Sequence, residues 1–186
     1  MRIVSAVILI VCLLSGCRAA DDQLNQAMAL RKRILEAECC SFQSIITADY
    51  GDELYTFQME CIMDKEGRLL FTVTDPESIS GITGHISQND AALTFDDTVL
   101  AVPMLADGQL APVSSPWIFI NTLRSGYLTA CSTDDDGLCI YIDDSYEDNP
   151  LHLEIYTDSN TIPIHADIIW QERRILSLDI RDFSLQ

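Results

Sequence analysis

The stretch SFQSIITADYGDELYTFQMECIM, residues Ser41–Met63, decides the fold class of this chain. Apolar and polar side chains alternate on both sides of Tyr50-Gly51, which is the period-two pattern of strands with one buried face. We therefore predict two antiparallel strands, Ser41–Asp49 and Glu53–Met63, joined by a two-residue turn. One face of the second strand would carry Tyr55, Phe57, Met59, Cys61 and Met63.

Similar alternating stretches follow on the C-terminal side of this hairpin. They predict strands at Arg68–Thr74, Ile82–Ser87, Ala92–Asp96, Val99–Val102, Tyr127–Thr133, Leu138–Asp143, Leu151–Thr157, Pro163–Trp170 and Arg174–Asp182. Turn-forming residues such as Gln88-Asn89-Asp90 separate neighbouring strands, as in a meander of hairpins. The pattern predicts a single, mainly β domain of the α+β class with about ten strands.

Two segments have helical periodicity instead. Asp22–Glu38 carries Leu24, Ala27, Met28, Arg31, Ile34 and Leu35 at helical spacing, which predicts an amphipathic N-terminal helix. A second, short helix is expected at Trp117–Arg124, capped by Ser115 and with Pro116 in its first position. This helix is apolar all round, so it is either buried or covers a cavity.

The N-terminus has the order of a secretory signal. Arg2 precedes an apolar run from Ile3 to Leu14, which is shorter than the roughly 20 residues that span a bilayer. The run ends in Leu14-Ser15-Gly16-Cys17, which resembles the bacterial lipobox. That resemblance implies a signal peptide at 1–16, a lipid on Cys17, a lipidated tether at 17–23 and a domain at 24–186. The alternative is a plain secretory signal with an incidental cysteine.

A lipid on Cys17 would place the protein on the extracytoplasmic face of the cell membrane. Two or more acyl chains, at about 0.8 kcal/mol per buried methylene, would hold it there stably. The chain without residues 1–16 has 10 basic and 29 acidic residues, a formal net charge of −19. Such a charge disfavours nucleic acid as a partner and disfavours binding of the protein surface to anionic lipid.

Beyond Cys17, five cysteines remain in a compartment that permits disulfides. A two-residue turn at Tyr50-Gly51 would place Cys40 opposite Cys61, and a turn around 134–136 would place Cys131 opposite Cys139. Opposed residues at non-hydrogen-bonded positions of a hairpin come within disulfide reach. We therefore predict these two disulfides, with Cys39 unpaired. The alternative is that the cysteines are reduced thiols buried in the core.

The lipobox, the N-terminal amphipathic helix, the antiparallel strands and the proline-rich approach to a mid-chain helix together resemble the LolA-like fold of lipoprotein carriers. Thr47-Ala48-Asp49-Tyr50-Gly51 also resembles a group of uncharacterised clostridial lipoproteins. The resemblance implies an incomplete antiparallel β-barrel with a helical lid over an apolar cavity, which sequesters acyl chains or another apolar ligand. In that cavity we expect Phe57, Met59, Phe71, Trp117, Phe119 and Ile120 to converge.

Motifs for catalysis, cofactors or metals are weak in this sequence. Nucleophile elbows, phosphate-binding loops and dinucleotide fingerprints are not found, so we expect no enzyme and no cofactor. The segment from Ser132 to Asp143 partly matches a calcium loop, but its strand context favours an acidic hairpin turn, and no metal is expected. Two functional hypotheses follow: a lipid-anchored binder of an apolar ligand, or an envelope interaction or sensor module with a filled core.

Overall fold

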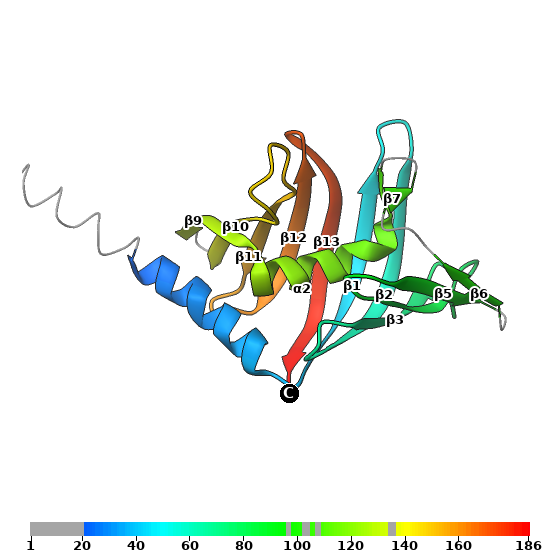
Figure 1. The fold of residues 1–186 in the computed structure, drawn as a ribbon, viewed down its shortest axis with the longest axis horizontal. Helices are drawn as coiled ribbons and strands as arrows, with labels where there is room; N and C mark the ends of the chain where they lie inside the picture. The colour runs from blue at the N-terminus through cyan, green and yellow to red at the C-terminus, as the bar shows by residue number, and fades with distance from the viewer. Residues whose placement is uncertain (1–20, 96–97, 102–104, 107–108, 134–136) are drawn as a thin grey trace, which may run out of the picture.

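The computed structural model describes residues 21–95, 98–101, 105–106, 109–133 and 137–186. Cys17 and the predicted signal peptide at 1–16 lie outside the described residues. The predicted architecture is confirmed: the chain is mainly β, with an open antiparallel sheet, an N-terminal helix and a short mid-chain helix (Figure 1).

The main sheet has eleven strands in the order β6-β5-β4-β3-β2-β1-β13-β12-β11-β10-β9. Their bounds are β1 Cys39–Asp49, β2 Leu54–Asp64, β3 Leu69–Asp75, β4 Thr83–Ile86, β5 Ala91–Phe95, β6 Thr98–Ala101, β9 Tyr127–Thr133, β10 Leu138–Asp143, β11 His152–Thr157, β12 Pro163–Trp170 and β13 Arg173–Leu185. A separate small hairpin pairs β7 (Leu105–Ala106) with β8 (Gln109–Leu110). Two meanders are therefore joined where the first strand pairs with the last.

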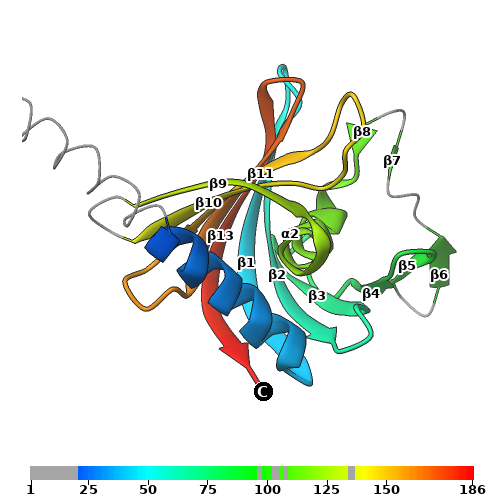
Figure 2. The same cartoon turned by 60° about the vertical axis from the view of Figure 1, so that its left-hand side comes forward.

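Strand alternation divides the sheet into an apolar and a more polar face. In β1, every second residue from Phe42 to Ala48 is buried, whereas the alternate residues Gln43, Ile45 and Thr47 are more exposed. The buried face curves around helix α2 (Ser115–Ser125), which crosses it (Figures 1 and 2). One apolar core therefore lies between the concave face of the sheet, α2 and the N-terminal helix 21–36.

The register of the first hairpin differs from the prediction by two residues. Asp49 pairs with Leu54, so four residues form the connection, and Cys40 opposes Met63 while Cys61 opposes Phe42. The loop is stabilised by an Asx-type turn, in which the Gly51 backbone N–H donates to Asp49 Oδ1 at 2.8 Å and Gly51 has φ +93°. The predicted opposition of Cys40 and Cys61 is therefore wrong.

The second cysteine pair is also displaced. Cys131 opposes Ile140 and Cys139 opposes Ser132. A shift of one residue moves a side chain to the other face of a sheet, so Cys131 and Cys139 do not share a face. Gly137 contributes to this register because a Cβ there would lie 2.1 Å from the Thr157 carbonyl oxygen, which indicates close packing of the turn on β11.

With these registers, the predicted cysteine pairs do not face each other across their hairpins. Cys39, Cys40, Cys61 and Cys131 are free thiols. Burial raises the pKa of Cys40 to about 12 and also raises the pKa of Cys61, so both are protonated at neutral pH and react poorly as nucleophiles.

Helix α2 begins differently from the expectation. Ser114, not Ser115, is its N-cap residue, and no side-chain capping bond forms. The two serine hydroxyls instead donate to the carbonyls of the preceding 3-10 turn, from Ser114 to Ala111 at 2.6 Å and from Ser115 to Pro112 at 2.7 Å. The apolar character of the helix on all sides is explained by burial, since Phe119 and Ile120 are 0% exposed.

The N-terminal helix 21–36 only partly follows its predicted pattern. Ala27, Leu30 and Ile34 are buried in the core, but Leu24, Met28 and Leu35 are exposed. The apolar face of the helix is therefore wider than the surface that the domain covers. Among the described helices, none is long and apolar enough to cross a bilayer.

Candidate ligand site on the concave face

The six residues predicted to line a cavity come together in the structure. All belong to one apolar cluster, with exposed fractions of 7% for Phe57, 1% for Met59, 4% for Phe71, 6% for Trp117 and 0% for Phe119 and Ile120. The three strand residues lie on the concave face, and the three helix residues belong to α2, which contacts β2. Phe119 packs edge-on against Phe42, with ring centroids 5.8 Å apart.

Hydrogen bonds connect one side of helix α2 to the rest of the domain. The Trp117 indole N–H donates to the Gly67 carbonyl at 3.0 Å, and the Arg124 guanidinium donates to the carbonyls of Asp64 and Lys65. All three acceptors lie at the turn between β2 and β3. From the N-terminal helix, Arg31 donates to the carbonyls at the end of α2.

The contacts of Arg31 show how the two helices are connected. Its Nε donates to the Leu123 carbonyl at 2.7 Å and its Nη2 to the Gly126 carbonyl at 2.9 Å. These carbonyls lack helical partners at the C-terminal end of α2, and a cation there interacts favourably with the helix dipole. Helix 21–36 and the end of α2 are therefore tied together on the same side of the sheet (Figure 2).

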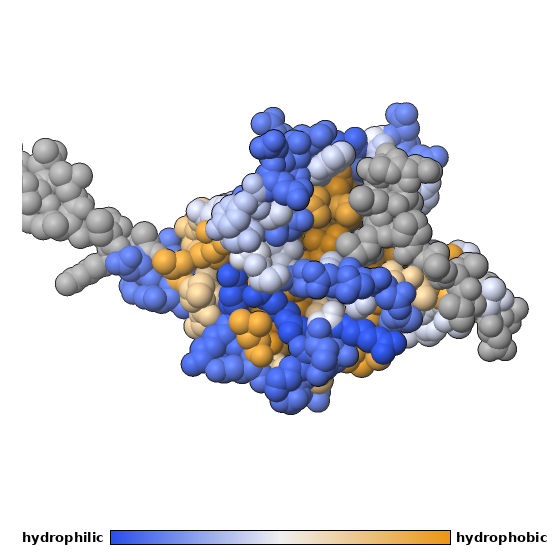
Figure 3. Space-filling view, in the orientation of Figure 1, coloured by the Kyte–Doolittle hydropathy of each residue, from blue (hydrophilic) through white to orange (hydrophobic). Residues whose placement is uncertain are grey.

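An apolar hollow lies on the other side of α2. Figure 3 shows it over the concave face, between the β12–β13 hairpin and the β1–β2 hairpin, with apolar atoms at its base. Near it, β8 is connected to the first hairpin by the Tyr50 hydroxyl, which donates to the Leu110 carbonyl at 2.6 Å.

One polar atom on the concave face has no partner. Ser44 is 1% exposed, opposes Met59 across the β1–β2 pair, and its hydroxyl makes no hydrogen bond within the described part of the chain. An unpaired buried hydroxyl costs free energy, and native structures contain few of them. Ser44 is thus a hydrogen-bonding group available to a ligand that enters the concave face.

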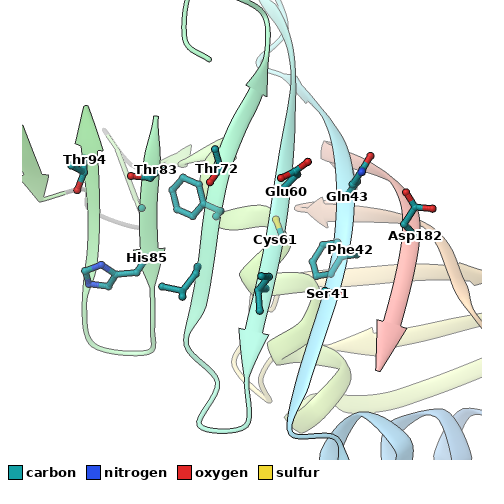
Figure 4. Close-up of a pocket in the computed structure, with 14 residues that line it drawn as sticks. Ser41, Phe42, Gln43, Glu60, Cys61, Thr72, Thr83, His85, Thr94 and Asp182 are labelled. Carbon is teal, nitrogen blue, oxygen red and sulfur yellow. The ribbon is translucent and has the colours of Figure 1, made fainter. Parts of the chain in front are cut away.

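A second depression lies on the opposite face of the sheet. It has a volume of about 590 Å³. Gln43, Glu60, Thr72, Thr83 and Thr94, which come from five adjacent strands, form much of its wall (Figure 4). It is open and rich in hydroxyl and carboxylate groups, so its chemistry differs from that of the predicted apolar cavity.

Polar clusters on this outer face were missed by the sequence analysis. His165 on β12 lies between Asp179, at 2.7 Å from Nδ1, and Asp167, at 3.2 Å from Nε2, while the Ser177 hydroxyl is 3.3 Å from Nε2. Strand alternation could have placed His165 beside Asp167 on one face and Ser177 beside Asp179 on the facing strand. The cross-strand register, which pairs His165 with Asp179, depends on the folded hairpin.

This arrangement favours a protonated imidazole, not a catalytic base. The hydrogen bonds to Asp167 and Asp179 raise the pKa of His165 although burial opposes this effect. Burial raises the pKa of Asp167, but the bonds from His165 and Ser177 outweigh it and keep this pKa below the usual range. Because both imidazole nitrogens face carboxylates, neither is available to accept a proton from Ser177.

We expect His165 to make stability depend on pH. The pKa of His165 is higher in the folded state than its unfolded-state value of about 6.5, so protonated His165 contributes to the free energy of unfolding. This contribution is complete at pH values below about 6.5 and is lost as the pH rises through the folded-state pKa. Unfolding of wild type and His165→Asn by urea, measured from pH 5 to pH 9, should therefore give a difference in stability that is largest at the acid end. A difference that is constant over this range would contradict the assignment of a protonated His165.

The calcium-loop pattern from Ser132 to Asp143, where no metal is expected, is only partly described by the structure. Residues 134–136 of the calcium-loop pattern lie outside the described residues. Within the described ranges, no group of three or more His, Cys, Asp and Glu side chains is placed to hold a metal ion.

No protein-family model matches the sequence, and no curated protein sequence matches it. The structure, however, is similar to a candidate outer membrane lipoprotein-sorting protein domain from Vibrio parahaemolyticus, with a TM-score of 0.51 and 10% identity over 90% of this chain and 93% of that chain. It is also similar to a LolA superfamily protein from Nitrosomonas europaea, with a TM-score of 0.44 and 10% identity over 86% and 93% of the two chains. The fold is LolA-like.

A third similar structure is lipoprotein LppX from Mycobacterium tuberculosis, with a TM-score of 0.43 and 9% identity over 89% of this chain and 95% of that chain. At these identities the likeness concerns the fold alone. A shared fold does not determine the ligand, which depends on the residues of the concave face.

Proposed function

We propose that this protein is a membrane-anchored, extracytoplasmic lipoprotein that binds a lipid or another apolar ligand on the concave face of its sheet. In this proposal residues 1–16 are a signal peptide, Cys17 carries the lipid, 17–23 is the tether and 24–186 is the LolA-like domain. The protein is not an enzyme and acts by sequestering or presenting its ligand. The sorting role in the name of the Vibrio parahaemolyticus domain is compatible with this proposal.

The observation that carries the proposal is the apolar hollow beside α2 (Figure 3). Apolar surface that is left open in a concave site is typical of ligand pockets, which combine such surface with a few polar groups. The Ser44 hydroxyl, which is on the concave face and has no hydrogen-bond partner among the described residues, is a candidate for such a group. An acyl chain with an ester or carboxyl oxygen matches both features, because the chain would fill the apolar space and the oxygen would accept the hydrogen bond.

The charge of the protein supports an apolar ligand over a polyanionic one. The whole chain has a formal net charge of −18. On the concave face, the described cations Arg31 and Arg124 already donate to backbone carbonyls. A phosphate-rich ligand would therefore meet repulsion without a free cationic partner at these positions.

A second function, an envelope interaction or sensor module without a ligand, is favoured by one observation. The six side chains predicted to line a cavity already bury one another, as their low exposed fractions show. In this alternative the concave face is a filled core, and partners would bind elsewhere on the sheet.

Uptake of a fluorescent fatty acid separates the two functions. We expect the wild-type domain to bind the probe saturably and unlabelled fatty acid to displace it. Trp117→Arg should reduce this uptake at least about tenfold, because a charge on α2 makes the apolar face costly to occupy. The matched control is Leu54→Arg, which adds the same charge at a side chain that is 68% exposed and should bind the probe like wild type.

Folding of each variant is checked by circular dichroism and thermal unfolding. Wild-type protein that shows no saturable uptake, and that carries no acyl chain when native mass spectrometry is performed on material from its own host, would reject ligand binding. If Trp117→Arg unfolds the domain and wild type takes up no probe, the filled-core alternative is supported.

A further inference from the structure

A stripe of apolar side chains on helix 21–36 remains uncovered by the domain. Leu24 is 44% exposed, Met28 47% and Leu35 44%. Single exposed apolar residues are common on protein surfaces, but a row of them along one helix indicates an interaction surface. We call these three residues the apolar stripe.

Helical geometry shows that the three residues form one surface. At about 100° per residue, Met28 and Leu35 lie within roughly 40° of Leu24 around the helix axis. The buried residues Ala27, Leu30 and Ile34 lie on an adjacent sector. The helix therefore has one broad apolar face, and the domain covers about half of it.

Hydrogen bonds to the domain set the orientation of helix 21–36 and keep the apolar stripe exposed to solvent. Arg31 is bonded to the end of α2, and Arg33 donates to the Thr161 carbonyl at 2.8 Å. At the start of the helix, the Gln23 amide donates to the Thr133 hydroxyl at 2.9 Å. Rotation of the helix to bury Leu24, Met28 and Leu35 would break these bonds, so the stripe is a stable feature of the folded domain.

The position of the stripe along the chain identifies what can cover it. Leu24 follows Cys17 by seven residues, which span at most about 25 Å when fully extended. A lipid on Cys17 would therefore keep the first turn of the helix within that distance of the bilayer. An anchored domain holds this helix near the membrane continuously.

The charge of helix 21–36 also favours a position close to the membrane. Helix 21–36 contains three basic residues, Arg31, Lys32 and Arg33, and three acidic residues, Asp21, Asp22 and Glu36. The rest of the chain is strongly acidic, so this helix is repelled by a membrane surface much less than the other parts of the domain. Exposed apolar side chains on a helix with a polar opposite side are typical of helices that lie in the membrane interface.

We propose that the apolar stripe docks on the surface of the bilayer that carries the lipid anchor, with Leu24, Met28 and Leu35 inserted at the boundary between headgroups and acyl chains. This inference rests on the proposed anchoring at Cys17. Through the bonds of Arg31 to Leu123 and Gly126, docking places the C-terminal end of α2 beside the membrane.

The test uses the lipid-anchored protein in phosphatidylcholine vesicles whose acyl chains are brominated, because bromine quenches tryptophan fluorescence at short range. In a Trp170→Phe background, Trp117 is the one native tryptophan left, and its emission is measured in that background protein and subtracted. The added tryptophan of Met28→Trp should then be quenched about twofold relative to unbrominated vesicles, as expected for a side chain at the acyl boundary. Gln26→Trp is the matched control. Gln26 is exposed and is two residues closer to Cys17 along the chain than Met28, but it lies on the opposite side of the helix, so it should show little quenching.

The outcomes separate docking from anchoring. Flotation of the protein with the vesicles, together with quenching at position 28 but not 26, supports the proposal. Flotation with no quenching at position 28 overturns it and leaves the stripe as a surface for a protein partner. Equal quenching at both positions also overturns it, because the tether alone would then explain proximity. Failure to float shows instead that the lipid anchor itself is absent.

Discussion

Replacement of Cys17 by serine is expected to abolish membrane attachment almost completely. Under the proposed anchoring, the thiol of Cys17 in Leu14-Ser15-Gly16-Cys17 forms the thioether to a diacylglyceryl group. Without this thiol the protein would lack two or more acyl chains, each contributing about 0.8 kcal/mol per buried methylene. Cys17→Ser should therefore be found as uncleaved precursor or released protein, and it should incorporate no radiolabelled fatty acid.

Cys39→Ser is the matched control for this experiment. It removes a thiol that is free in the structure and lies 22 residues after Cys17. This variant should keep both the label and the membrane attachment. Equal labelling of wild type and Cys17→Ser would show that the lipid is attached elsewhere or that no lipoprotein forms.

Phe119→Ala should produce the largest loss of stability among the truncations of α2. The Phe119 side chain is 0% exposed and lies at the centre of the interface between α2 and the sheet, against Phe42. Truncation of a buried phenylalanine to alanine costs about 3–5 kcal/mol, because it removes apolar contacts and leaves a cavity. For a domain of this size we expect the melting temperature to fall by roughly 10 °C.

Tyr146→Ala provides the comparison. Tyr146 is 83% exposed, and substitutions at such positions usually change stability by less than about 0.5 kcal/mol. Urea unfolding of the three proteins measures both effects. A loss below about 1 kcal/mol for Phe119→Ala would show that α2 rests loosely on the concave face. In that case the face could open for a ligand at low cost.

The convergence of Phe57, Met59 and Phe71 with α2 could be predicted from local patterns. Strand alternation assigns each side chain to a face, and a short helix that is apolar all round has to be buried. Both patterns depend on neighbours in the chain. The cluster around His165 was not predicted, because it requires the register of β12 against β13 and not only the alternation within each strand.

The N-terminal helix gives a similar contrast. Its spacing of Leu24, Met28 and Leu35 indicates an amphipathic helix, but the spacing is the same whether a domain or a membrane covers that face. The exposed fractions of these residues show that the domain leaves them uncovered, and these fractions depend on how the helix packs against the sheet.

The strands, the two helices and the open, mainly β architecture could be predicted from the sequence, because hydrophobic periodicity is a property of consecutive residues. The positions of the cysteines and the uncovered half of helix 21–36 depend instead on the tertiary structure. The Asx turn at Asp49 and Gly51 accompanies a β1–β2 register that differs by two residues from the predicted one. The packing of Gly137 against Thr157 accompanies the shifted register of the β9–β10 pair. Loop geometry and contacts between distant segments set these features, and no local pattern encodes them.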